Sequence, residues 1–131
     1  MSRNRDTKQG PSQRQLRVGE LIRRVLSDAL MRGETHEPDL AGRSITVGEV
    51  RVSPDLRRAT VFVMPLGGAE QELALAALTR ARGELRRAVT REVRIKHAPE
   101  LEFRLDESFD RMDETRALLG QERVRRDIEG E

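Results

Sequence analysis

Arginines recur along one face of a helical stretch in the second half of the chain, residues 73–95. Within it Arg87, Thr90, Arg91 and Arg94 follow one another at spacings of three, one and three. Such spacings place side chains on one face of a helix. A guanidinium group binds phosphate through paired hydrogen bonds. The pattern therefore predicts a surface for a phosphate-bearing ligand.

A glycine interrupts the apolar pattern of the same stretch. The apolar residues form two stripes on either side of it, Leu73, Ala77 and Ala81 and then Leu85, Ala88 and Val89. A glycine inside a helix costs about 1 kcal/mol relative to alanine. It also lets the backbone bend or approach another surface closely. We therefore predict two helices joined at a structural kink formed by Ala81 and Gly83, with a backbone that phosphates can approach.

Length and composition restrict the class of protein. The chain has 131 residues, which fits one compact domain. It has no cysteine, so disulfides and thiolate metal sites are excluded. No apolar run approaches the roughly 20 residues of a membrane span, and the N-terminus lacks the apolar segment of a secretory signal. We expect a soluble cytoplasmic protein.

The charged residues are unevenly distributed, although the net charge is only +2. The sums by segment are +5 for residues 1–24, −3 for 25–79, +5 for 80–97 and −5 for 98–131. All of the 25 cationic residues except Lys8 and Lys96 are arginine. Two basic blocks favour a polyanionic partner. A bias in genomic composition is the alternative explanation for the arginine content.

The chain divides into an arm, a domain and a tail. We expect a disordered basic arm over residues 1–11, a folded domain over 12–108 and a charged, partly helical or disordered tail over 109–131. An amphipathic helix is predicted between Ser12 and Gly33. The pattern then predicts three strands, at residues 44–53 with a bulge at Gly48, at 58–65 after a turn at 53–56, and at 100–105.

The predicted order of elements is α-β-β-α-kink-α-β. This order predicts an α+β fold, a type II KH-like domain in which a three-stranded sheet carries helices on one face. KH domains usually have a G-x-x-G loop between the paired helices. No G-x-x-G occurs in this chain, and Ala81-Arg82-Gly83 stands in its place.

Four groups of motifs recur in the order of a known family. They are Arg17-Val18; Val50-Arg51-Val52-Ser53-Pro54-Asp55-Leu56 with the following Arg57 to Val63; Ala81-x-Gly83 with Leu85-Arg86; and Pro99 to Phe103 with Asp106-Glu107-Ser108. Together, over roughly residues 14–119, they resemble the ribosome-binding factor A family of bacterial small-subunit assembly factors. It implies a protein that binds the immature 30S subunit and its precursor 16S rRNA. It also implies help in late 16S rRNA processing and 30S maturation, without catalysis, cofactor or metal.

The resemblance also implies which residues contact RNA. These are Arg80, Arg82, Gly83, Arg86, Arg87 and Arg91, together with Lys96, where the family tends to carry arginine. The basic face of the first helix adds Arg17 and Arg24. The alternative for that face is simple pairing with Glu20 and Asp28 at helical spacings.

Other functions fit the sequence less well. A protein-interaction module, whose arginines bind an acidic protein partner, is the alternative to RNA binding. An enzyme is disfavoured because His36 and His97 lie apart from any nucleophile, and Asp106, Asp110 and Asp113 lack the spacing of a calcium loop. We expect no membrane partner, no small-molecule substrate, and a monomer when free.

Aromatic residues are too few for a base-stacking platform. The chain has three phenylalanines and neither tryptophan nor tyrosine. We assign Phe62 and Phe103 to the core. Without aromatic platforms, RNA recognition runs through phosphates and backbone groups, which predicts steep salt dependence.

Overall fold

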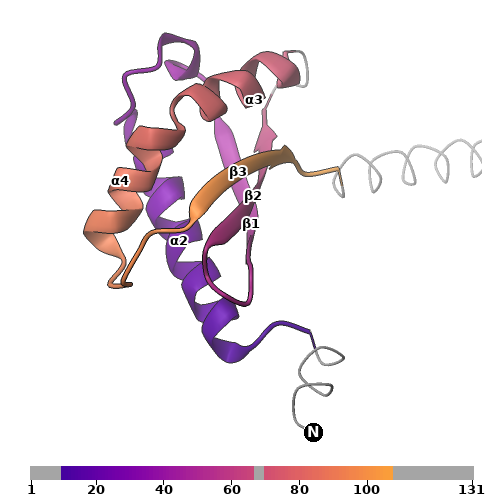
Figure 1. The fold of residues 1–131 in the computed structure, drawn as a ribbon. Helices are drawn as coiled ribbons and strands as arrows, with labels where there is room; N and C mark the ends of the chain where they lie inside the picture. Colours follow the sequence, from indigo (N-terminus) through magenta and orange to yellow (C-terminus); the bar gives the residue numbers. More distant parts are fainter. Residues whose placement is uncertain (1–9, 67–69, 108–131) are drawn as a thin grey trace, which may run out of the picture.

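A computed structural model describes residues 10–66 and 70–107, which form one sheet with a layer of helices (Figure 1). The elements are α2 (Gln13–Arg32), the 3-10 turn η1 (Pro38–Leu40), β1 (Ile45–Val52), β2 (Arg58–Pro65), α3 (Gln71–Arg80), α4 (Arg82–Glu92) and β3 (Glu100–Leu105). This order confirms the predicted KH-like α+β fold. The expected tail, and all of the expected arm except Gly10 and Pro11, lie outside the described residues.

The sheet has the strand order β1-β2-β3. β1 and β2 form an antiparallel hairpin, whereas β2 and β3 run parallel. The register shifts between Val47 and Glu49, so the predicted bulge at Gly48 is confirmed. The hairpin turn closes with a hydrogen bond of 2.8 Å from the Leu56 amide to the Ser53 carbonyl. Leu56 adopts a left-handed backbone, with φ at 61°.

The helices cover one face of the sheet, as predicted. Along β2, the residues Ala59, Val61 and Val63 are fully buried beneath them. Phe62 lies between two of these positions and therefore faces the opposite side, because side chains alternate along a strand. It is half-buried, and the Arg51 guanidinium carbon lies 5.0 Å from its ring centroid. The assignment of Phe62 to the core was wrong, whereas Phe103 is buried.

Helix α2 is fixed at both ends by its own sequence. At the start, the Ser12 hydroxyl accepts a hydrogen bond from the Gln15 amide, and the Gln15 side chain accepts one from the Ser12 amide. At the end, Gly33 is left-handed, with φ at 65°. Between them, Gly19 is buried so closely against β1 that an added Cβ would lie 2.6 Å from the Val50 carbonyl oxygen. The predicted limits of this helix are confirmed.

Helices α3 and α4 meet at a sharp break, as predicted. Ala81 is the one residue between them and leaves helical geometry, with φ at −81° and ψ at 1°. It is 2% exposed, so a small side chain permits the two helices to pack at the break. Leu73, predicted to share the buried face, is 50% exposed, and Ala74 and Leu78 are buried in its stead. The other two residues of the predicted stripe, Ala77 and Ala81, are buried as expected.

Candidate nucleic-acid interface

One face of helix α4 packs into the core, and its arginines lie on the exposed part of its surface. Leu85, Ala88 and Val89 are buried in the core beneath this helix. Arg87 and Arg91 are exposed on the opposite side of the helix, and Arg82 is exposed at its first residue. The 3.6-residue period of the helix thus separates Arg87 and Arg91 from the apolar side chains.

These three arginines differ from several other cations of the protein in having no carboxylate partner. Within the part of the chain that the structure describes, Arg82, Arg87 and Arg91 form no ion pair. An exposed guanidinium without such a partner keeps its donors for a ligand. The three side chains are therefore available to an anion.

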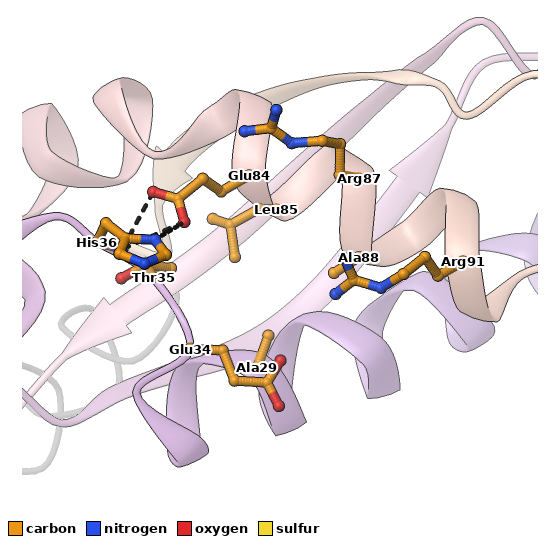
Figure 2. Close-up of a pocket in the computed structure, with 9 residues that line it drawn as sticks. All are labelled: Ala29, Glu34, Thr35, His36, Glu84, Leu85, Arg87, Ala88 and Arg91. Atoms are coloured by element: carbon orange, nitrogen blue, oxygen red, sulfur yellow. Dashed lines mark hydrogen bonds and ion pairs between the residues drawn. The ribbon is translucent and has the colours of Figure 1, made fainter.

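A cleft of about 460 Å³ lies beside α4, between that helix and the end of α2 (Figure 2). Arg87 and Arg91 extend from α4 along one rim, and Glu34 stands on the other (Figure 2). Ala29, Leu85 and Ala88 also line it. The cleft therefore combines an apolar lining with charges of opposite sign.

Glu84 closes one end of this cleft by holding the loop after α2. Its carboxylate lies 2.8 Å from Nδ1 of His36 and accepts the His36 backbone N–H at 3.0 Å. The side-chain hydrogen bond to His36, followed by the backbone bond, lowers the pKa of Glu84. The sequence did not indicate this contact, because 48 residues separate the partners. Glu84 is a positioning residue for the cationic helix.

Arg80 is engaged in a structural contact. Its guanidinium lies 2.9 Å from a carboxylate oxygen of Glu37 and 2.7 Å from one of Asp39. The hydrogen bond from Arg80 lowers the pKa of Glu37, whose side chain is only 15% exposed. These two contacts hold η1 against the end of α3. Arg80 thus differs from the unpaired arginines of α4.

Arg86 is likewise turned toward the protein. Its Nε and a terminal nitrogen both donate to the carbonyl oxygen of Ala98, at 3.2 and 2.8 Å. Ala98 and Pro99 are buried just before β3. The contact therefore holds the connection between α4 and β3, and uses part of the donor capacity that Arg86 would offer to RNA.

Gly83 lies inside α4, two residues beyond the break. The predicted kink at Ala81 and Gly83 is confirmed for Ala81, which leaves helical geometry between α3 and α4, and was wrong for Gly83, which is helical. A Cβ added at Gly83 would meet nothing within 4 Å among the described residues. The fold therefore does not require glycine at this position. The surface around Gly83, beside Arg82, is open.

The remaining basic candidates lie on α2 and after α4. Arg17 and Lys96 are exposed and form no ion pair within residues 10–66 and 70–107, whereas Arg24 lies 3.4 Å from Glu20. Glu20 is held mainly by Arg23, at 2.6 Å, and that hydrogen bond lowers the pKa of Glu20 to about 2. The predicted pairing on α2 therefore forms in part, with Arg23 as the principal partner.

Metal and membrane sites receive no support from the described residues. They contain no group of three potential metal-ligating side chains. Of the three aspartates considered above, Asp110 and Asp113 lie outside the described residues. No helix in the described part is long and apolar enough to cross a bilayer.

The fold defines a KH-like α+β module, a class of domain that usually binds RNA at a G-x-x-G loop between its paired helices. Within that class, the chain belongs to the ribosome-binding factor A family, whose model matches residues 14–119. The family name describes a binding factor and no enzyme activity.

Individual relatives agree with this membership. The chain is 65% identical over 120 residues to ribosome-binding factor A of Paracoccus denitrificans, covering 92% of this chain and 87% of the relative. The crystal structure of ribosome-binding factor A from Thermus thermophilus matches with a TM-score of 0.58 and 32% identity, over 70% of this chain and 94% of that one. A homology model of the Thermus thermophilus factor, fitted into a cryo-EM map of a 30S–RbfA complex, matches with a TM-score of 0.52 and 30% identity, over 66% and 89%.

Proposed function

We propose that this protein binds the immature 30S subunit through precursor 16S rRNA and assists late 16S rRNA processing and 30S maturation. Family membership supports the proposal, as does the relative fitted into a map of a 30S–RbfA complex. We further propose that it acts as a cytoplasmic monomer, by binding and without catalysis.

The observation that carries the proposal is the unpaired arginine face of α4. Arg23 and Arg80 are each bound by a carboxylate within the fold. On α4, Arg82, Arg87 and Arg91 form no ion pair with the described carboxylates. The Glu84 carboxylate binds His36, and that hydrogen bond is the main cause of its lowered pKa, to which the charge of Arg87 contributes. A group of exposed arginines outside ion pairs is favourable when a polyanion binds and releases its counterions.

Binding can change the course of RNA folding only if the protein prefers one state. A ligand shifts an equilibrium by its difference in affinity for the two conformations. An assembly factor must therefore bind the immature particle more tightly than the mature one. The helical repeat of α4 fixes the spacing of its arginines, and the buried Leu85 and Val89 hold the helix on the core, so a correctly shaped RNA can match them.

The experiment compares two charge reversals of equal size. In the first variant, Arg87 and Arg91 are changed to glutamate. In the control, the exposed Arg57 and Arg58 near the β1–β2 turn are changed to glutamate. Co-sedimentation measures binding to immature 30S particles and to 70S ribosomes, and circular dichroism checks folding.

We expect the unmodified protein to bind immature 30S particles more tightly than 70S ribosomes. The Arg87→Glu/Arg91→Glu variant should lose at least about tenfold in affinity, equivalent to about 1.4 kcal/mol, while the control stays within about twofold. Equal loss in both variants would indicate a nonspecific charge effect. Unchanged association of a folded α4 variant would contradict the proposal and favour an acidic protein partner for this surface.

A further inference from the structure

The cleft between α2 and α4 has rims of opposite charge, and this arrangement follows from the local structure of each rim. On the α2 side, Gly33 ends the helix in a left-handed turn, and the Glu34 amide donates to the Ala29 carbonyl at 3.1 Å. This closure places Glu34 just above the last buried turn of α2. On the α4 side, Arg87 and Arg91 are about one helical turn apart.

The cleft is large enough for a nucleotide-sized group. Its volume of about 460 Å³ lies within the range of roughly 300–1,000 Å³ typical of small-ligand sites. Leu85 is 1% exposed and Ala88 is 5% exposed, so the core fixes the floor of the cleft and a ligand meets mainly the polar side chains of the rims. The contact of Glu84 with His36 closes one end, as Figure 2 shows.

The two rims have different hydrogen-bonding capacities. Arg87 and Arg91 only donate, and they suit a phosphate group. Glu34 only accepts when ionised, and its ion-pair contact within the described chain is a weak one of 3.5 Å with Arg32, whose side chain is 70% exposed. A ligand that fits both rims carries a phosphate at one end and an amino donor at the other, with a planar apolar body between.

We propose that this cleft receives a single unstacked nucleotide of the bound RNA. Its phosphate lies at Arg87 and Arg91, its base occupies the cleft between the two rims, and its exocyclic amino group donates to Glu34. The inference rests on the proposed function, because the nucleotide belongs to the RNA bound there. It adds a base preference, since cytosine presents an amino donor where uracil presents a carbonyl oxygen.

The test is an NMR titration of the full chain with CMP, UMP and inorganic phosphate. We expect CMP to shift the backbone amides of Glu34 and Thr35 in addition to those near Arg87 and Arg91, and phosphate to shift only the amides near the two arginines. One well-placed hydrogen bond to a base edge discriminates by about 1 kcal/mol or more, so CMP should bind at least about fivefold more tightly than UMP.

The variant Glu34→Gln should abolish the preference for CMP, because an amide side chain both donates and accepts. The matched control is Glu92→Gln, an exposed substitution on α4 that does not line the cleft and should retain the preference. Identical shifts with CMP and phosphate, or no shift of Glu34 and Thr35 with CMP, would overturn the inference.

The inference and the proposed function fail in different ways. If charge reversal at Arg87 and Arg91 leaves 30S binding intact, the proposed function is wrong. If that reversal abolishes 30S binding but CMP does not occupy the cleft, only the nucleotide site is wrong. Measurement of Glu34→Gln on immature 30S particles adds a second readout, for which we expect a loss of affinity of about two- to fivefold. An unchanged affinity there would also overturn the nucleotide site.

Discussion

Replacing a helical glycine by alanine should have opposite effects at two positions of this fold. Gly19 lies in α2 and Gly83 in α4. A Cβ at Gly19 would lie 2.6 Å from the Val50 carbonyl oxygen, closer than Cβ atoms approach in real structures, whereas a Cβ at Gly83 would meet nothing within 4 Å. The two substitutions have the same chemistry and differ only in surroundings.

The expected magnitudes follow from these distances. Alanine gains about 1 kcal/mol over glycine in a helix interior. At Gly19 the obstructing atom belongs to the backbone of β1, which cannot rotate away, so overpacking of about 3 kcal/mol outweighs that gain. Gly19→Ala should therefore lose about 2 kcal/mol, and Gly83→Ala should gain up to about 1 kcal/mol because its site is open.

Thermal unfolding by circular dichroism measures both effects. For a domain of this size, 1 kcal/mol corresponds to about 4–8 °C in Tm, so Gly19→Ala should lower Tm by roughly 8–16 °C. Gly83→Ala should leave Tm unchanged or raise it. Equal shifts in the two variants would refute the packing assigned to α2 and β1. Any loss of 30S binding by a fully folded Gly83→Ala would report close approach of RNA at that position.

Three further outcomes are expected. Arg86→Ala should lower stability by about 1–2 kcal/mol in chemical denaturation, because the Ala98 carbonyl loses its donor, and Arg86→Lys should restore part of the loss. Folding lowers the pKa of Glu84 and lowers that of Glu20 to about 2. The two ionised carboxylates therefore stabilise the fold fully above about pH 4.5, and this contribution declines as the pH falls toward about 2. Acid titration followed by circular dichroism measures the decline. Arg87→Ala should reduce the slope of log affinity against log salt by slightly less than about 1, measured by binding at several salt concentrations.

Local patterns in the sequence were sufficient to predict the helices and strands and their order along the chain. The capping pair at Ser12 and the glycine at Gly33 determine α2 by contacts within a few residues, and the limits of that helix were predicted correctly. The phase slip at Gly48 predicted the bulge for the same reason. Such features depend on neighbours along the chain, so residue types and spacing are enough to find them.

Features that depend on tertiary contacts were not predicted. The pairing of Arg80 with Glu37 joins residues 43 positions apart, and only the fold brings them together. Phe62 was assigned to the core by its apolarity alone, whereas the alternation of β2 turns it to the other face. The kink was assigned to Ala81 and Gly83 together, but only Ala81 leaves helical geometry, and its burial favours a small side chain there. The candidate site remains a prediction, supported by the unpaired arginines of α4.

The parallel pairing of β2 and β3 has a consequence for synthesis on the ribosome. Arg58 pairs with Glu100, so β2 leaves the exit tunnel about forty residues before its second neighbour exists. During that interval the hairpin presents an open edge, with unsatisfied amide and carbonyl groups, to any other extended chain. The nascent protein thus completes its sheet only after both paired helices have emerged, and its vulnerability to misassembly ends with the last strand.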